Sequence, residues 1–122
     1  MHVLGYDEKF LHERGAFHTA SEIESQPSLW LSVYRKLLEN KHGLRKFMQT
    51  AVAEADKIVL TGAGTSAYIG LSLQGVFSRN LRKTTLAIAT TDLVTHPGDY
   101  FFNSETVLLV SFARSGNSPE ST

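Results

Sequence analysis

Two short segments of this chain combine glycine with serine or threonine directly after an apolar run. The first, residues 62–67, reads Gly-Ala-Gly-Thr-Ser-Ala and follows the apolar residues 58–60. The second, residues 111–118, reads Ser-Phe-Ala-Arg-Ser-Gly-Asn-Ser and follows the apolar residues 107–110. Glycine allows close approach of the backbone, and a helix that starts after such a turn offers unpaired N–H groups to an anion. Both segments therefore have the residue types of a phosphate-binding loop.

The hydroxyl groups and one arginine identify the candidate ligands. Arg114 can add a charge-assisted hydrogen bond to a phosphate, and Gly116 permits a positive φ. Each hydrogen bond to a charged group contributes about 1.5–3 kcal/mol, so a handful can hold a monophosphate without a metal ion. No residue of the chain is identified as catalytic. The candidate phosphate-binding residues are Gly64, Thr65, Ser66, Arg114, Ser115, Gly116, Asn117 and Ser118.

Each loop also has another interpretation. Residues 62–67 match the relaxed dinucleotide fingerprint Gly-x-Gly-x-x-Ala, whose ribose-binding acid would be Asp92, although Asp92 comes later than that fold requires. The ordinary role of Asp92 would be to cap a turn that starts at Leu93. The glycines can also serve only a tight turn, and Ser118 can simply cap a following helix. Two hydroxyl-rich loops at adjacent strand ends favour one phosphate site, because such ends converge on one crevice.

Helical periodicity dominates the first half of the chain. Thr19 fits an N-cap in a capping box, and Pro27 fits the first turn of the next helix. Residues 1–18 show no clear period, and we expect an arm with a short helix there. Helices with this much apolar surface need a partner, either the sheet or a second subunit. The spacing of apolar residues predicts helices over residues 19–26, 27–40 and 43–55.

The second half predicts alternating strands and helices. Apolar, β-branched runs predict strands over residues 58–60, 84–90 and 106–111. A helix ending near residues 80–82 would link the first two strands, and a connection with a helical turn would link the next two. This order predicts an α/β fold: a three-layer αβα, doubly wound parallel sheet preceded by N-terminal helices. Because the third strand would lack its crossover helix, we expect a truncated chain.

The two loops resemble those of the sugar isomerase (SIS) domain family. Its Gly-Thr-Ser turn corresponds to residues 64–66, and its serine-rich loop to residues 113–118, with Ala113 where serine is usual. Residues 22–27 resemble the Glu-Ile-x-x-Gln-Pro segment of glucosamine-6-phosphate synthase and its relatives. Together with Trp30, these segments are most similar to the bacterial group of tagatose-6-phosphate ketose/aldose isomerases and galactosamine-6-phosphate deaminases. The resemblance assigns residues 1–45 to an N-terminal arm with helices, and residues 46–122 to part of a flavodoxin-like SIS domain.

This resemblance implies a function for the whole protein. A 6-phosphosugar would bind through Ser66, Ser115 and Ser118, with Thr65 and Arg114 adjacent. A proton would move between C1 and C2 of the sugar, and ammonia would leave when the substrate is an amino sugar. The acid or base of the family comes from later in the chain or from a neighbouring subunit. The resemblance also implies no cofactor and a homo-oligomer. A phosphosugar-sensing module without turnover, and a dinucleotide-binding Rossmann fragment, are the alternatives.

Composition limits the classes of partner. The 122 residues include 12 Lys and Arg and 12 Asp and Glu, so the net charge of zero gives no argument for nucleic acid or an anionic membrane. The apolar residues 107–110 are too few to span a bilayer, and residues 1–18 do not resemble a signal peptide. The chain has no cysteine, and its five histidines show no metal-ligand spacing. We therefore expect a cytoplasmic protein without a bound metal.

Overall fold

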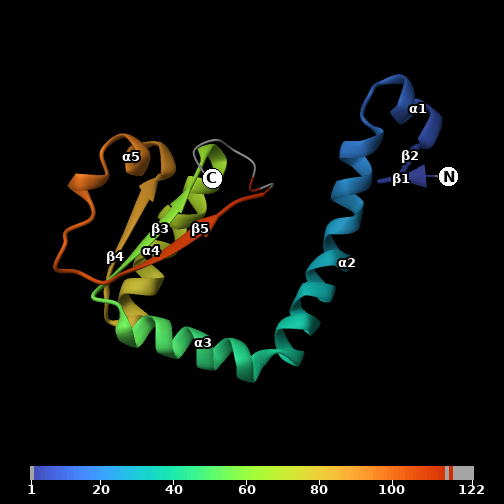
Figure 1. The fold of residues 1–122 in the computed structure, drawn as a ribbon. Helices are drawn as coiled ribbons and strands as arrows, with labels where there is room; N and C mark the ends of the chain where they lie inside the picture. The colour runs from blue at the N-terminus through green and yellow to red at the C-terminus, as the bar shows by residue number, and fades with distance from the viewer. Residues whose placement is uncertain (1, 115, 117–122) are drawn as a thin grey trace. The chain divides into compact units, whose positions relative to one another are not determined.

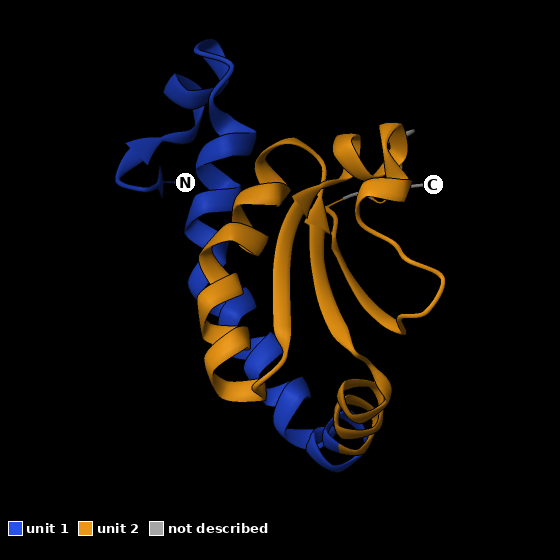
Figure 2. Ribbon diagram, turned by 90° about the vertical axis from the view of Figure 1, so that its left-hand side faces the viewer, with its two compact units in different colours: residues 1–45 blue, residues 46–122 orange. Residues whose placement is uncertain are grey.

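A computed structural model describes residues 2–114 and 116 of the chain. Figure 1 shows the chain as a ribbon, and Figure 2 colours its two compact units, residues 1–45 and residues 46–122. Unit 1 denotes the first and unit 2 the second. Within the described residues, no helix has the combination of length and apolar character needed to cross a membrane.

Unit 1 begins with a small hairpin that packs on two helices. Strands β1 (His2–Val3) and β2 (Tyr6–Asp7) pair antiparallel, and the two residues between them have positive φ, as tight hairpins require. Helix α1 (Glu8–Glu13) follows, with the Asp7 side chain accepting a hydrogen bond from the backbone N–H of Lys9 at 2.9 Å. Thus the short helix expected in residues 1–18 is confirmed, whereas the hairpin was not predicted. The buried residues of this unit are Val3, Leu11 and Ala20.

Helix α2 (Phe17–Glu39) runs without a break through Pro27. The prediction of two helices that meet at Pro27 is therefore wrong, and so is Thr19 as N-cap, since the N-cap is Ala16. A proline removes one intrahelical hydrogen bond, and a helix of 23 residues retains many others on both sides of it. The capping-box pattern at Thr19 is thus a local signal that the longer helix overrides.

Helix α3 (Lys41–Glu54) leads to the parallel sheet of unit 2. The sheet contains β3 (Lys57–Gly62), β4 (Thr84–Ala89) and β5 (Val107–Phe112), in the order β4-β3-β5. Both pairings of β3 are parallel, so the predicted parallel α/β architecture is confirmed. The predicted bounds of the third helix and of all three strands differ from the observed ones by at most two residues at each end.

Helix α4 (Ala67–Leu81) covers one face of this sheet, as Figure 1 shows. At Gly70, an added Cβ would lie 3.2 Å from the Leu60 side chain and 3.5 Å from the Ala87 side chain, so a glycine allows the helix to pack closely. Buried residues on the opposite face are Val59, Ile88 and Leu93, which come from β3, β4 and α5 (Thr90–Thr95). Both faces of the central strand are therefore covered.

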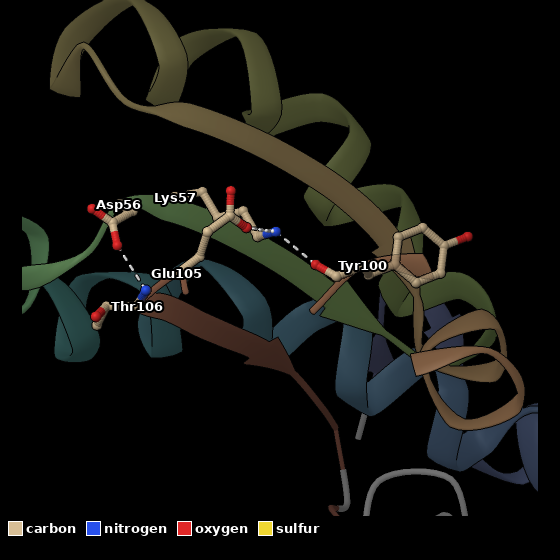
Figure 3. Close-up of polar contacts among 5 residues, drawn as sticks. All are labelled: Asp56, Lys57, Tyr100, Glu105 and Thr106. Atoms are coloured by element: carbon tan, nitrogen blue, oxygen red, sulfur yellow. Dashed lines mark hydrogen bonds and ion pairs between the residues drawn. The ribbon is translucent and has the colours of Figure 1, made fainter. Parts of the chain in front are cut away.

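A polar cluster holds β5 beside β3 at the N-terminal edge of the sheet (Figure 3). The Lys57 ammonium group is buried, pairs with the Glu105 carboxylate, and donates to the Tyr100 carbonyl at 2.6 Å. The Asp56 carboxylate accepts from the Thr106 N–H at 2.7 Å, while the Asp56 N–H donates to the Thr106 carbonyl at 2.8 Å. These contacts fix the start of β5 and thereby the register of both strands.

Candidate functional site

The C-terminal ends of the three strands lie side by side at one edge of the sheet. Gly62, the last residue of β3, is in register with Ala89 of β4 and with Phe112 of β5. The chain leaves the central strand toward β4 on one side and returns as β5 on the other. In open parallel sheets, a crevice for ligands forms at this kind of switch point. The two hydroxyl-rich loops therefore start at the same edge, as the sequence predicted.

The first loop is a tight turn that requires its glycines. A Cβ on Gly62 would lie 2.7 Å from the carbonyl carbon of Ser66 and 2.8 Å from its oxygen, which no side chain can tolerate without movement. Gly64 has a φ of +54°, in the left-handed region that glycine favours. The backbone N–H of Ser66 donates to the carbonyl of Ala63 at 3.1 Å, which closes the 3₁₀ turn η1 (Gly64–Ser66). The turn thus brings residues 64–66 directly to the N-terminus of α4.

The hydroxyl of Ser66 is not used to cap this helix. Ser66 occupies the N-cap position of α4 but makes no side-chain cap hydrogen bond. It is half-buried, while Thr65 beside it is exposed. Because α4 is a helix of 15 residues, its N-terminus adds a positive electrostatic potential at this point. The arrangement is suited to an anion that accepts hydrogen bonds from hydroxyl and N–H groups.

The second loop is described only in part. Arg114 and Gly116 are exposed and follow β5 at the same edge of the sheet, and Gly116 has a φ of +71°. Its positive φ agrees with the expectation that Gly116 permits a positive φ at this position. The other three candidate ligands of this loop, Ser115, Asn117 and Ser118, lie outside the described residues, and their roles stay predictions.

Comparison with known proteins finds relatives that match most of this chain. No family model matches the chain. The putative D-galactosamine-6-phosphate deaminase AgaS of Streptomyces coelicolor is 47% identical over 107 residues, which cover 87% of this chain and 28% of that protein. The D-galactosamine-6-phosphate deaminase AgaS of a Shewanella species is 43% identical over 115 residues, covering 91% of this chain and 30% of that protein. A crystal structure of a putative tagatose-6-phosphate ketose/aldose isomerase from Clostridium novyi superposes with a TM-score of 0.91 at 43% identity, covering 99% of this chain and 31% of that one.

These relatives support an SIS-type family of isomerases and deaminases for this chain. The resemblance found in the two loops is therefore confirmed. The chain spans about 30% of the length of the relatives it matches.

One pair of buried hydroxyl groups near this site was not recognised in the sequence. Thr61 of β3 and Thr90 of α5 are 3% and 8% exposed, and their hydroxyl oxygens are 3.3 Å apart. They connect the C-terminal ends of two strands immediately beside Gly62. The sequence does show a threonine at the end of each of two apolar runs. Only the strand register, however, shows that these two ends lie side by side.

The dinucleotide interpretation has less support from the structure. Asp92 lies within the first turn of α5, beyond the end of β4, and not at the strand end where a ribose-binding acid belongs. Its expected role as a cap of a turn from Leu93 is wrong, because the helix begins at Thr90. His96, which follows α5, is exposed, and its Nδ1 lies 2.9 Å from the hydroxyl oxygen of Thr95. Among residues 2–114 and 116, no three His, Cys, Asp or Glu side chains form a metal site.

Proposed function

We propose that the intact protein is an isomerase or deaminase that acts on a 6-phosphosugar of the galactosamine-6-phosphate or tagatose-6-phosphate type. The relatives carry the names of both activities, and the two loops have the chemistry of a phosphate site. This chain would supply that site, as the N-terminal part of a SIS domain over residues 46–122. On its own, the stretch of 122 residues would be inactive. No cofactor is part of the proposal.

One observation carries the assignment of the site: Gly62 is in register with Phe112, so the two loops leave neighbouring strands at one edge of the sheet. The phosphate would accept hydrogen bonds from both loops, and the guanidinium of Arg114 would supply the positive charge. Holding the phosphate leaves C1 and C2 of the sugar free for chemistry at the other end of the substrate. The proposed ligands are Gly64, Thr65, Ser66, Arg114, Ser115, Gly116, Asn117 and Ser118.

The reaction would open the sugar ring and transfer a proton between C1 and C2. An enediol or enolamine path requires a general base within hydrogen-bond reach of the substrate carbon. In a deaminase the amino group leaves as ammonia, and in an isomerase the carbonyl moves between C1 and C2. The two loops offer hydroxyl groups and one arginine, which suit an anion but do not provide that base. We therefore place the base outside this chain or on a neighbouring subunit.

Two further parts of the proposal concern where and how the protein acts. A cytoplasmic location follows from the substrate, since a sugar phosphate carries up to about two negative charges and does not cross a bilayer unaided. A homo-oligomer follows from the exposed apolar residues of α2, several of which are more than half exposed.

The test uses the intact protein with galactosamine-6-phosphate and tagatose-6-phosphate, measuring ammonia release and aldose–ketose exchange. Replacing Ser66 by Ala removes one hydrogen bond to a charged group, so KM should rise at least about tenfold with little change in kcat. Ser72→Ala is the matched control, because Ser72 lies on the same helix and its hydroxyl donates to the Ile69 carbonyl at 2.8 Å. Tight phosphosugar binding without turnover would instead indicate a sensing module. Thermal protection by NAD but not by phosphosugar would indicate a dinucleotide site.

A further inference from the structure

The buried pair of threonine hydroxyl groups lies on the face of β3 that α4 does not cover. Val59 packs on this face with Leu93 of α5, and side chains two apart in a strand share a face, so Thr61 lies there as well. The Thr61 hydroxyl oxygen is 3.3 Å from that of Thr90, the first residue of α5. The two residues are only 3% and 8% exposed, so water competes little for this hydrogen bond. The pair therefore connects the end of β3 to the start of α5.

Helix α4 packs on the opposite face of the same strand through two close approaches. A Cβ on Gly70 would lie 3.2 Å from the Cβ of Leu60, in the middle of β3. A Cβ on Gly62 would lie 2.7 Å from the carbonyl carbon of Ser66 and 2.9 Å from its Cβ. Such spacings leave no gap between the strand and the first turns of the helix. Ser66 must therefore follow any displacement of the end of β3.

A continuous series of contacts thus leads from α5 to the first hydroxyl-rich loop. Thr90 contacts Thr61 through the hydroxyl groups, and Thr61 is bonded to Gly62. Gly62 in turn lies against Ser66, at the N-cap position of α4. All of these residues belong to unit 2. Since a hydrogen bond weakens steeply when its donor moves out of line, a small displacement of Ser66 is enough to weaken the binding of an anion there.

We infer that Thr61 and Thr90 are positioning residues for the phosphate site, and that their hydrogen bond holds the end of β3 where Ser66 can reach the phosphate. This inference rests on the proposed function and adds to it two residues that do not contact the ligand. Apolar packing, as between Val59 and Leu93, is not directional, whereas a hydrogen bond constrains both distance and angle. The hydroxyl groups thus supply a constraint on the strand end that the apolar residues of the same face do not.

The test measures KM and kcat of the intact protein for galactosamine-6-phosphate and tagatose-6-phosphate, and their affinities by calorimetry, at a temperature at which every variant is folded. Thr61→Val keeps the shape of the side chain but removes its hydroxyl, so KM should rise about three- to tenfold with kcat within about twofold. Thr61→Ser retains the hydroxyl and should have a KM within about twofold of the parent value. Thr90→Val should match Thr61→Val. The double valine variant should raise KM no further, because all three variants lack the same hydrogen bond.

Thr85→Val is the matched control for the loss of a buried hydroxyl. Thr85 is also 3% exposed, and its hydroxyl donates to the Lys83 carbonyl at 3.2 Å. It pairs with Ile58 near the start of both strands, away from the edge where the hydroxyl-rich loops begin. Thr85→Val should therefore lower the urea unfolding midpoint about as much as Thr61→Val does, while KM and the affinity stay unchanged.

The outcomes separate this inference from the proposed function. An intact parent protein that neither converts nor binds either phosphosugar would refute both. An active parent whose KM is unchanged in Thr61→Val would retain the proposed function and refute the positioning role. A rise in KM that Thr85→Val shares would refute that role too, because the effect would then follow from lower stability. So would a rise that Thr61→Ser also shows, since the hydroxyl would then not be the cause.

Discussion

Replacing Gly62 by alanine should damage both the stability of unit 2 and its affinity for phosphate. The new Cβ would lie 2.7, 2.8 and 2.9 Å from three atoms of Ser66, two of which belong to the backbone. Because backbone atoms cannot rotate away as a side chain can, the turn η1 must move. Overpacking of this kind lowers the free energy of unfolding by about 3 kcal/mol. The displaced segment carries the hydroxyl groups of Thr65 and Ser66, so binding should weaken as well.

Two other glycines provide controls of different severity. In Gly64→Ala, the new Cβ has no other atom within 4 Å, but the alanine must adopt a φ of +54°. This backbone strain should lower the free energy of unfolding by about 1–2 kcal/mol. Gly98→Ala also has open space and no positive φ, so the free energy of unfolding should stay unchanged or rise by about 0.5 kcal/mol. We therefore expect Gly98→Ala to be the most stable of the three variants, Gly64→Ala to be intermediate, and Gly62→Ala to be the least stable.

The assay combines urea unfolding of the intact protein with calorimetric titration of galactosamine-6-phosphate. The Gly62 variant should show a lower unfolding midpoint at unchanged m-value and an affinity at least about tenfold weaker. The affinity of the Gly98 variant should equal that of the parent. If Gly62→Ala proved as stable as Gly98→Ala and bound the phosphosugar equally well, the close approach at Ser66 would not matter. The account of the first loop would then be wrong.

Three further sets of substitutions test contacts that hold the fold. Glu105→Gln leaves the buried Lys57 ammonium group without its carboxylate and should lower the free energy of unfolding by about 3 kcal/mol in urea. Lys57→Met should lower the free energy of unfolding by only about 1 kcal/mol, because the Glu105 side chain that it leaves unpaired is more exposed to water. Equal losses in the two variants would contradict the argument that the cost depends on which partner is buried. Thr61→Val and Thr90→Val should each lower the free energy of unfolding. In a double-mutant cycle, the loss in the double variant should be about 1 kcal/mol smaller than the sum of the two single losses. Strict additivity would mean that the two hydroxyl groups do not interact. Pro27→Ala should raise the free energy of unfolding by about 2–3 kcal/mol, because the proline lies inside α2. If thermal unfolding showed no change, a helix that starts at Pro27 would be favoured instead.

Local signals in the sequence were sufficient for the elements of unit 2. Apolar runs of the right length gave three strands, and helical spacing after the glycine turn gave α4 with its C-terminal end at residue 81. Parallel pairing followed from the strand–helix–strand order, since parallel neighbours require a crossover. The turn between β3 and α4 could be predicted as well, because Gly64, Thr65 and Ser66 are contiguous, while their role in binding phosphate stays a prediction.

Contacts between residues far apart in the sequence needed the tertiary structure. The buried Lys57 meets Glu105 and Tyr100 only because β5 lies beside β3, and nothing in the neighbourhood of Lys57 predicts this. The pairing of Thr61 with Thr90 depends likewise on the register of β4.

Helix α2 shows the converse case, in which a local signal misled. Pro27 and the capping box at Thr19 each predict a boundary, but one broken hydrogen bond weighs little against a helix of 23 residues. The sequence by itself thus determined the element types in unit 2 and the residue types from which a phosphate site in its loops is predicted, since both depend on residues close in the chain. Only the tertiary structure decided which residues meet at the edge of the sheet, because strand register and long-range pairing are properties of the packed chain.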